Sequence, residues 1–134
     1  MNSAIQMYAL GLDQIATAIR NGGHKRTILV QGHMGTGKSS LLTTLAHDLP
    51  KHTPCYFDCT TKDLGDITIP KMNKLDDADY VSYATNEELG AHHKTPIILM
   101  IDEYGKANPA VKNALLRVML ERKIGGYTLH RDSI

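Results

Sequence analysis

A segment near the N-terminus has the glycine spacing and the lysine of a phosphate-binding loop. Residues 32–39 fit the pattern G-x-x-x-x-G-K-[ST] without a mismatch. Glycines let the backbone curl so that its N–H groups face an anion, Lys38 brings a point charge to the β- and γ-phosphates, and Ser39 offers a hydroxyl to Mg²⁺. The competing interpretation is a glycine-rich turn with an incidental lysine. We predict a nucleotide site formed by Gly32, His33, Met34, Gly35, Thr36, Gly37, Lys38, Ser39 and Ser40.

Two adjacent carboxylates, Asp102 and Glu103, follow the apolar run 97–101. Carboxylates at the mouth of a buried strand are costly unless a cation or substrate uses them. Beside a phosphate loop, Asp102 would hold Mg²⁺ through water opposite Ser39, and Glu103 would deprotonate the attacking water. The alternative is that the pair only begins a solvated loop. We therefore predict Lys38 and Glu103 as catalytic residues and Ser39 and Asp102 as the Mg²⁺ site, a set that favours a water-activating ATPase over a small-molecule kinase.

Hydrophobic periodicity places both sites on an alternating series of strands and helices. Such alternation predicts a three-layer α/β domain with a mostly parallel sheet, whose carboxyl edge carries both sites. The polar stretch 60–95 is weakly periodic, and the tail 127–134 reads as extended. The predicted elements are helices over 3–20 and 41–49, a helix from Pro109 ended by Gly125-Gly126, buried strands over 27–30, 54–58 and 97–101, a short strand over 80–83 and a helical turn over 86–89.

Length and charge limit the classes of protein that fit. The chain has 134 residues, enough for one domain with a core, and 15 Lys and Arg against 14 Asp and Glu. This balance argues against a DNA-coating protein, and the longest apolar run is far shorter than the roughly 20 residues of a membrane span. We expect a cytoplasmic protein without a membrane contact. Cys55 and Cys59 have no second pair to complete a zinc site, so buried thiols are favoured over a ligand pair.

Residues 101–122 resemble one family closely. Their sequence, IDEYGKANPAVKNALLRVMLER, follows the Walker B strand and next helix of the MoxR-like branch of AAA+ ATPases. Residues 63–70 are similar to a substrate-side loop of phage and prophage members. The resemblance runs from about residue 25 to the C-terminus. It implies an AAA+ type P-loop NTPase using ATP and Mg²⁺, with residues 1–24 as an N-terminal helix and 25–134 as the nucleotide-binding core.

The sequence departs from that family at its end. In the AAA+ fold a strand with a polar sensor residue lies between the P-loop strand and the Walker B strand, and the arginine finger and lid come later. Residues 1–134 are therefore expected to be a partial domain, truncated before the sensor strand and lid, with weak or no turnover. The slot left in the sheet would be filled by the tail 127–134 or by strand exchange in a dimer. Arg122 could serve a neighbouring subunit, although a solvated helix face, with Arg117 and Glu121 as an i,i+4 pair, is the plainer interpretation.

The resemblance also implies a function for the longer protein. Members of this branch are homo-oligomeric, chaperone-type remodelling ATPases that commonly work with a partner carrying a von Willebrand A-type domain. Two alternatives stay open: a nucleotide-binding module without significant turnover, and a DNA-handling ATPase of the helicase-loader kind. The balanced charge makes nucleic acid the least favoured partner.

Overall fold

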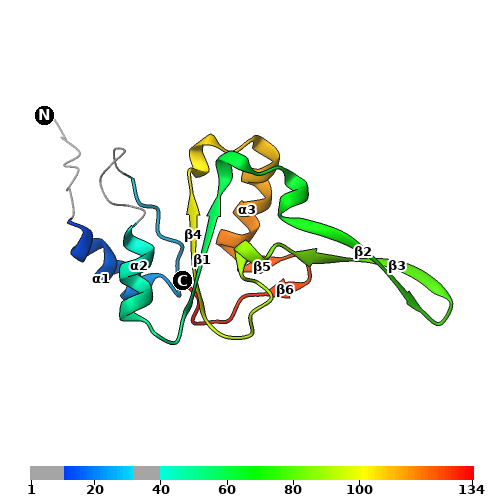
Figure 1. The fold of residues 1–134 in the computed structure, drawn as a ribbon, viewed down its shortest axis with the longest axis horizontal. Helices are drawn as coiled ribbons and strands as arrows, with labels where there is room; N and C mark the ends of the chain where they lie inside the picture. Colours follow the sequence, from blue (N-terminus) through cyan, green and yellow to red (C-terminus); the bar gives the residue numbers. More distant parts are fainter. Residues whose placement is uncertain (1–10, 32–39) are drawn as a thin grey trace, which may run out of the picture.

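The computed structural model describes residues 11–31 and 40–134 (Figure 1). Part of the predicted helix 3–20, over residues 3–10, and the loop 32–39 lie outside these ranges. No helix in the described ranges is long and apolar enough to cross a membrane. The helices are α1 (Leu12–Gly22), α2 (Ser40–Asp48) and α3 (Pro109–Glu121), and the strands are β1 (Thr53–Asp58), β2 (Thr68–Leu75), β3 (Ala78–Thr85), β4 (Ile97–Asp102), β5 (Lys123–Ile124) and β6 (Tyr127–Thr128).

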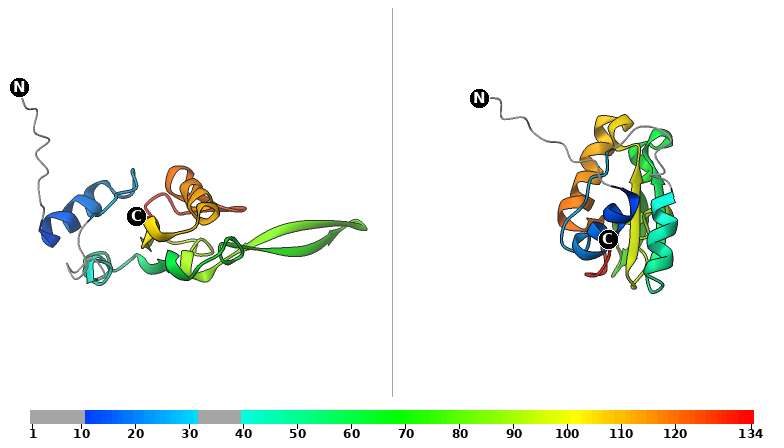
Figure 2. Two further views of the ribbon diagram at one scale, coloured as in Figure 1. Left: turned by 90° about the horizontal axis from the view of Figure 1, so that it is seen from above. Right: turned by 90° about the vertical axis from the view of Figure 1, so that its left-hand side faces the viewer.

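The centre of the fold is a parallel pair of strands between helices. β1 and β4 pair in register from Thr53 opposite Ile97 to Asp58 opposite Asp102. α2 lies on one side of this pair and α3 on the other (Figure 2). The arrangement confirms the predicted α/β class with a parallel sheet.

Each face of β4 packs against its own hydrophobic cluster. Ile97 joins Cys55 and Phe57 in a cluster with the buried residues of α3, which are Val111, Leu115 and Val118. Ile98 points the other way, into a cluster with Ala16 and Ile19 of α1 and Leu41 and Leu45 of α2. Because side chains alternate along a strand, burial on both faces explains why residues 97–101 are apolar without interruption.

The predicted strand over 27–30 is not formed. Residues 27–31 have no regular secondary structure, and in the described ranges no backbone hydrogen bond joins them to β4. The Thr27 hydroxyl instead donates to the carbonyl of Met119, at 2.9 Å. The local sequence has strand character, but a strand also requires a hydrogen-bonded neighbour.

The C-terminal residue occupies part of the space between this segment and β4. The Ile134 N–H donates to the Ile97 carbonyl and the Leu99 N–H donates to the Ile134 carbonyl, both at 2.8 Å. The buried Ser133 hydroxyl accepts from the Ile97 N–H, at 3.1 Å. The expectation that the tail would fold against the open edge is confirmed for its last residues.

Two other segments differ from the prediction. Residues 68–85 form a long antiparallel hairpin, β2–β3, that projects from the body (Figure 2), where only a short strand over 80–83 was expected. Most of its side chains are exposed on both faces, so the sequence lacks the alternation that marks a half-buried strand. Gly125-Gly126 does not end α3 but makes the two-residue turn between β5 and β6. The predicted turn over 86–89 is confirmed by a 3₁₀ turn at Glu87–Leu89.

Arg122 ties three segments together at the end of α3. It caps the helix in a left-handed conformation, with φ of 58°. Its guanidinium donates to the Ser133 carbonyl at 3.0 Å and to the Gly23 carbonyl at 2.8 Å. Burial lowers the pKa of Arg122. Arg122 is therefore not a solvated helix-face residue, whereas Arg117 does pair with Glu121 on the surface, at 2.9 Å.

Replacing Arg122 with Ala should destabilise the chain by about 2 kcal/mol, because it leaves two inward-facing carbonyls without their donor. Arg117→Ala is the matched control: it removes an exposed i,i+4 ion pair worth about 0.5 kcal/mol. Urea denaturation of the three proteins gives the free energies of unfolding. Equal losses in the two variants would contradict the tie between α1, α3 and the tail.

Candidate functional site

The acidic pair lies where β4 ends. Asp102 is the last residue of the strand, and Glu103 follows with φ of 56°, in the left-handed region that non-glycine residues rarely adopt. Such a conformation costs on the order of 1 kcal/mol or more and is frequent at functional sites. The chain then enters α3, where the Asn108 side chain caps the helix by accepting from the Val111 N–H at 3.0 Å and Pro109 occupies the first turn. The strand and the capped helix thus fix both ends of the acidic segment.

Two donors hold the Asp102 carboxylate. Its Oδ1 accepts from the Glu103 N–H at 2.9 Å, and its Oδ2 accepts from the Tyr56 hydroxyl at 2.6 Å. The hydrogen bond to Asp102 is the largest cause that raises the pKa of Tyr56, to about 12. Sequence analysis missed Tyr56, because only the register of β1 on β4 reveals that Tyr56 and Asp102 share a face.

The other two carboxylates at this edge are differently engaged. Glu103 Oε2 lies 3.3 Å from the Lys106 ammonium, and the Glu103 side chain is 37% exposed, so water reaches it. Asp58 Oδ1 accepts from the N–H and the hydroxyl of Thr60, at 2.9 and 2.8 Å. These two bonds lower the pKa of Asp58. The edge is negatively charged, and its carboxylates are not equivalent.

The donor set at this edge fits a magnesium ion shared with a nucleotide. In the described ranges, no three His, Cys, Asp or Glu side chains converge as an all-protein metal site. Mg²⁺, however, is usually held by only one or two carboxylates together with phosphate oxygens and water. Each oxygen of Asp102 accepts one hydrogen bond from the protein, and a carboxylate oxygen has a second lone pair for a metal-bound water.

The residues that flank the predicted phosphate loop line the same cavity as the acidic pair. Gly32, His33, Met34, Gly35, Thr36, Gly37, Lys38 and Ser39 lie outside the described residues, while Ser40 begins α2. Gln31 before the loop and Leu41 after it line the same cavity as Asp102 and Glu103. The structure therefore brings the acidic pair together with both flanks of the loop.

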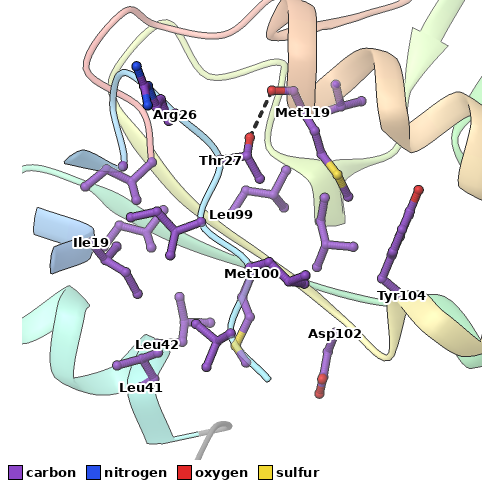
Figure 3. Close-up of a pocket in the computed structure, with 18 of the residues that line it drawn as sticks. Ile19, Arg26, Thr27, Leu41, Leu42, Leu99, Met100, Asp102, Tyr104 and Met119 are labelled. Atoms are coloured by element: carbon purple, nitrogen blue, oxygen red, sulfur yellow. Dashed lines mark hydrogen bonds between the residues drawn. The ribbon is translucent and has the colours of Figure 1, made fainter. Parts of the chain in front are cut away.

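That cavity has a volume of about 820 Å³ and lies between residues 27–31 and β4 (Figure 3). Asp102 lies at one end of it (Figure 3), and Glu103 also lines it. Its walls are otherwise mostly apolar, with Ile19, Leu42, Leu99, Met100 and Met119 among them. It lies between the same two segments as the slot that the family resemblance implied.

The two cysteines belong to the core. Cys55 and Cys59 are both free and buried. Burial raises the pKa of both thiols, that of Cys59 to about 11. The interpretation as buried thiols is confirmed.

Comparison with known proteins gives one result. A family model described as an AAA domain of the dynein-related subfamily matches residues 27–131. No curated protein and no solved structure matches the chain.

The raised thiol pKa values predict slow alkylation of the folded chain. At about pH 8, a thiol of pKa 11 is ionised in roughly one molecule in a thousand, and only the thiolate reacts. Iodoacetamide should therefore label Cys55 and Cys59 slowly in buffer and fast in guanidinium chloride, as mass spectrometry of timed samples would show. Equal rates in both solvents would mean that the thiols are exposed.

Proposed function

The chain belongs to the AAA domain family, in its dynein-related subfamily, and from this premise we propose that it binds ATP with Mg²⁺ and hydrolyses ATP to ADP and phosphate. The observation that carries the proposal is the position of Asp102 and Glu103, at the carboxyl end of β4 and on the same cavity as both flanks of the phosphate loop. Ligands of parallel α/β sheets bind at that edge.

The residues of the proposed site have separate roles. The loop from Gly32 to Ser39, with Ser40, binds the phosphates through backbone N–H groups, and Lys38 neutralises the β- and γ-phosphates. Ser39 and Asp102 would hold Mg²⁺, which supplies positive charge against the charge that develops on the phosphate oxygens. Glu103 is exposed to water and takes the proton of the attacking water molecule.

The finer assignment rests on the resemblance of residues 101–122. We propose the MoxR-like branch in its phage or prophage form, with residues 1–24 as the N-terminal helical part and 25–134 as the nucleotide-binding core. The corresponding activity is that of a homo-oligomeric remodelling ATPase with a von Willebrand A-type partner. A cytoplasmic location stays a prediction.

Thermal melts of the wild type and of Lys38→Ala, with and without ATP, test the nucleotide site. ATP with Mg²⁺ at about a hundred times its Kd should stabilise the wild type by about 2.7 kcal/mol, a shift of several degrees in Tm. Lys38→Ala should abolish that shift without changing the Tm of the nucleotide-free chain. A wild-type Tm that does not respond to ATP would contradict the proposed site.

Glu103→Gln separates hydrolysis from binding. Loss of the general base should lower phosphate release at least about 100-fold while the ATP-dependent Tm shift remains. Glu87→Gln, at an exposed residue of the 3₁₀ turn before Gly90, is the control and should hydrolyse ATP at the wild-type rate. Binding without turnover in the wild type would favour the nucleotide-binding module, and stimulation by DNA that weakens with salt would favour the DNA-handling ATPase.

A further inference from the structure

Tyr56 is the described side chain outside the acidic segment that holds Asp102. It lies in the middle of β1, opposite Met100 of β4, and its hydroxyl donates to Asp102 Oδ2 at 2.6 Å. Tyr56 pairs with Met100, and the next pair on the same face of the two strands is Asp58 with Asp102. The tyrosine side chain is long enough to reach from its own pair to Asp102. We propose that Tyr56 is a positioning residue for the Mg²⁺ site, an inference that rests on the proposed function.

Packing does not explain a tyrosine at this position. Its neighbours Cys55 and Phe57 are buried, with 7% and 0% exposure, whereas Tyr56 is 42% exposed. A hydroxyl that donates to a carboxylate makes a charge-assisted hydrogen bond, which is shorter and stronger than a neutral one. The polar end of Tyr56 is therefore its distinctive contribution to this face.

The hydroxyl has one carboxylate available on each strand and bonds the one on β4. Asp58 shares this face, but its Oδ1 already accepts two hydrogen bonds from Thr60. Asp102 Oδ1 is bound to the Glu103 N–H, which leaves Oδ2 for Tyr56. The two donors hold the carboxylate at both oxygens, so its plane cannot rotate freely, and each oxygen keeps a lone pair for a metal-bound water.

Removing the hydroxyl should weaken metal binding without removing a metal ligand. Groups that orient a ligand typically change metal affinity by about 10–100-fold when they are mutated. In Tyr56→Phe, one oxygen of Asp102 loses its donor and the carboxylate gains freedom around its side-chain torsions. The affinity of the Tyr56→Phe variant for Mg²⁺ should fall, while its phosphate loop should still bind ATP at saturating metal.

The test measures metal dependence directly. Mn²⁺ is titrated into the chain with saturating ATP and followed by electron paramagnetic resonance, and Mg²⁺ is titrated against the ATP-dependent Tm shift. In Tyr56→Phe the metal concentration at half effect should rise about 10–100-fold. Tyr80→Phe, a comparably exposed tyrosine on the β2–β3 hairpin, is the matched control and should behave as wild type.

Asp102→Asn separates the inference from the function on which it rests. If Asp102→Asn and Tyr56→Phe both raise the metal requirement and Tyr80→Phe does not, the inference is supported. If Asp102→Asn raises it and Tyr56→Phe does not, the role of Tyr56 is wrong and the proposed site stands. If Asp102→Asn has no effect, the proposed Mg²⁺ site fails and the inference with it. A Tyr56→Phe chain that melts without cooperativity in the absence of nucleotide would also overturn the proposal, in favour of a purely structural role.

Discussion

The parallel pairing of β1 with β4 is the constraint on which the rest of the structure depends. Both strands contribute to the cluster under α3, and Ile98 of β4 also anchors the cluster under α1 and α2. Side chains alternate along a strand, so the register that buries Phe57 also sets Tyr56 beside Asp102. A slip of one residue would turn the buried residues outward and separate these two side chains. Core packing therefore fixes the polar geometry of the candidate site.

On the edge of β4 opposite β1, the C-terminal tail and Arg122 make the stabilising hydrogen bonds. Unpaired strand edges expose backbone groups that require partners. Ile134 satisfies the Ile97 carbonyl and the Leu99 N–H, and Arg122 holds the preceding Ser133 carbonyl and the Gly23 carbonyl after α1. One guanidinium thus connects the residue after α1 and the C-terminal tail to the end of α3. Gly23, Arg122 and Ile134 also line the apolar cavity beside β4, whose wall includes residues 27–31.

Sequence reasoning succeeded where a local pattern carries the structure. The apolar run 97–101, and Pro109 at the start of α3, predict their elements without knowledge of distant residues. It failed where a strand needs a hydrogen-bonded neighbouring strand, and where the side chains of a strand are exposed on both faces. Residues 27–31 have the composition of a strand, but no described strand makes a backbone hydrogen bond to them. The β2–β3 hairpin is too exposed to leave an alternating pattern. Asp102 and Glu103 could be found from their adjacency; Tyr56 required the register.

An apolar contact holds α2, the helix that follows the predicted phosphate loop, on the face of the sheet that carries Asp102. α2 begins at Ser40, directly after the phosphate loop, and packs through Leu41 and Leu45 against Ile98. Ile98 and Asp102 are four residues apart on one strand, so they face the same side of the sheet. Packing α2 on Ile98 therefore places this helix on the face that carries the carboxylate. The position of α2 relative to Asp102 is set by buried hydrocarbon, and the polar groups at the edge then refine the orientation of a carboxylate that is already in place.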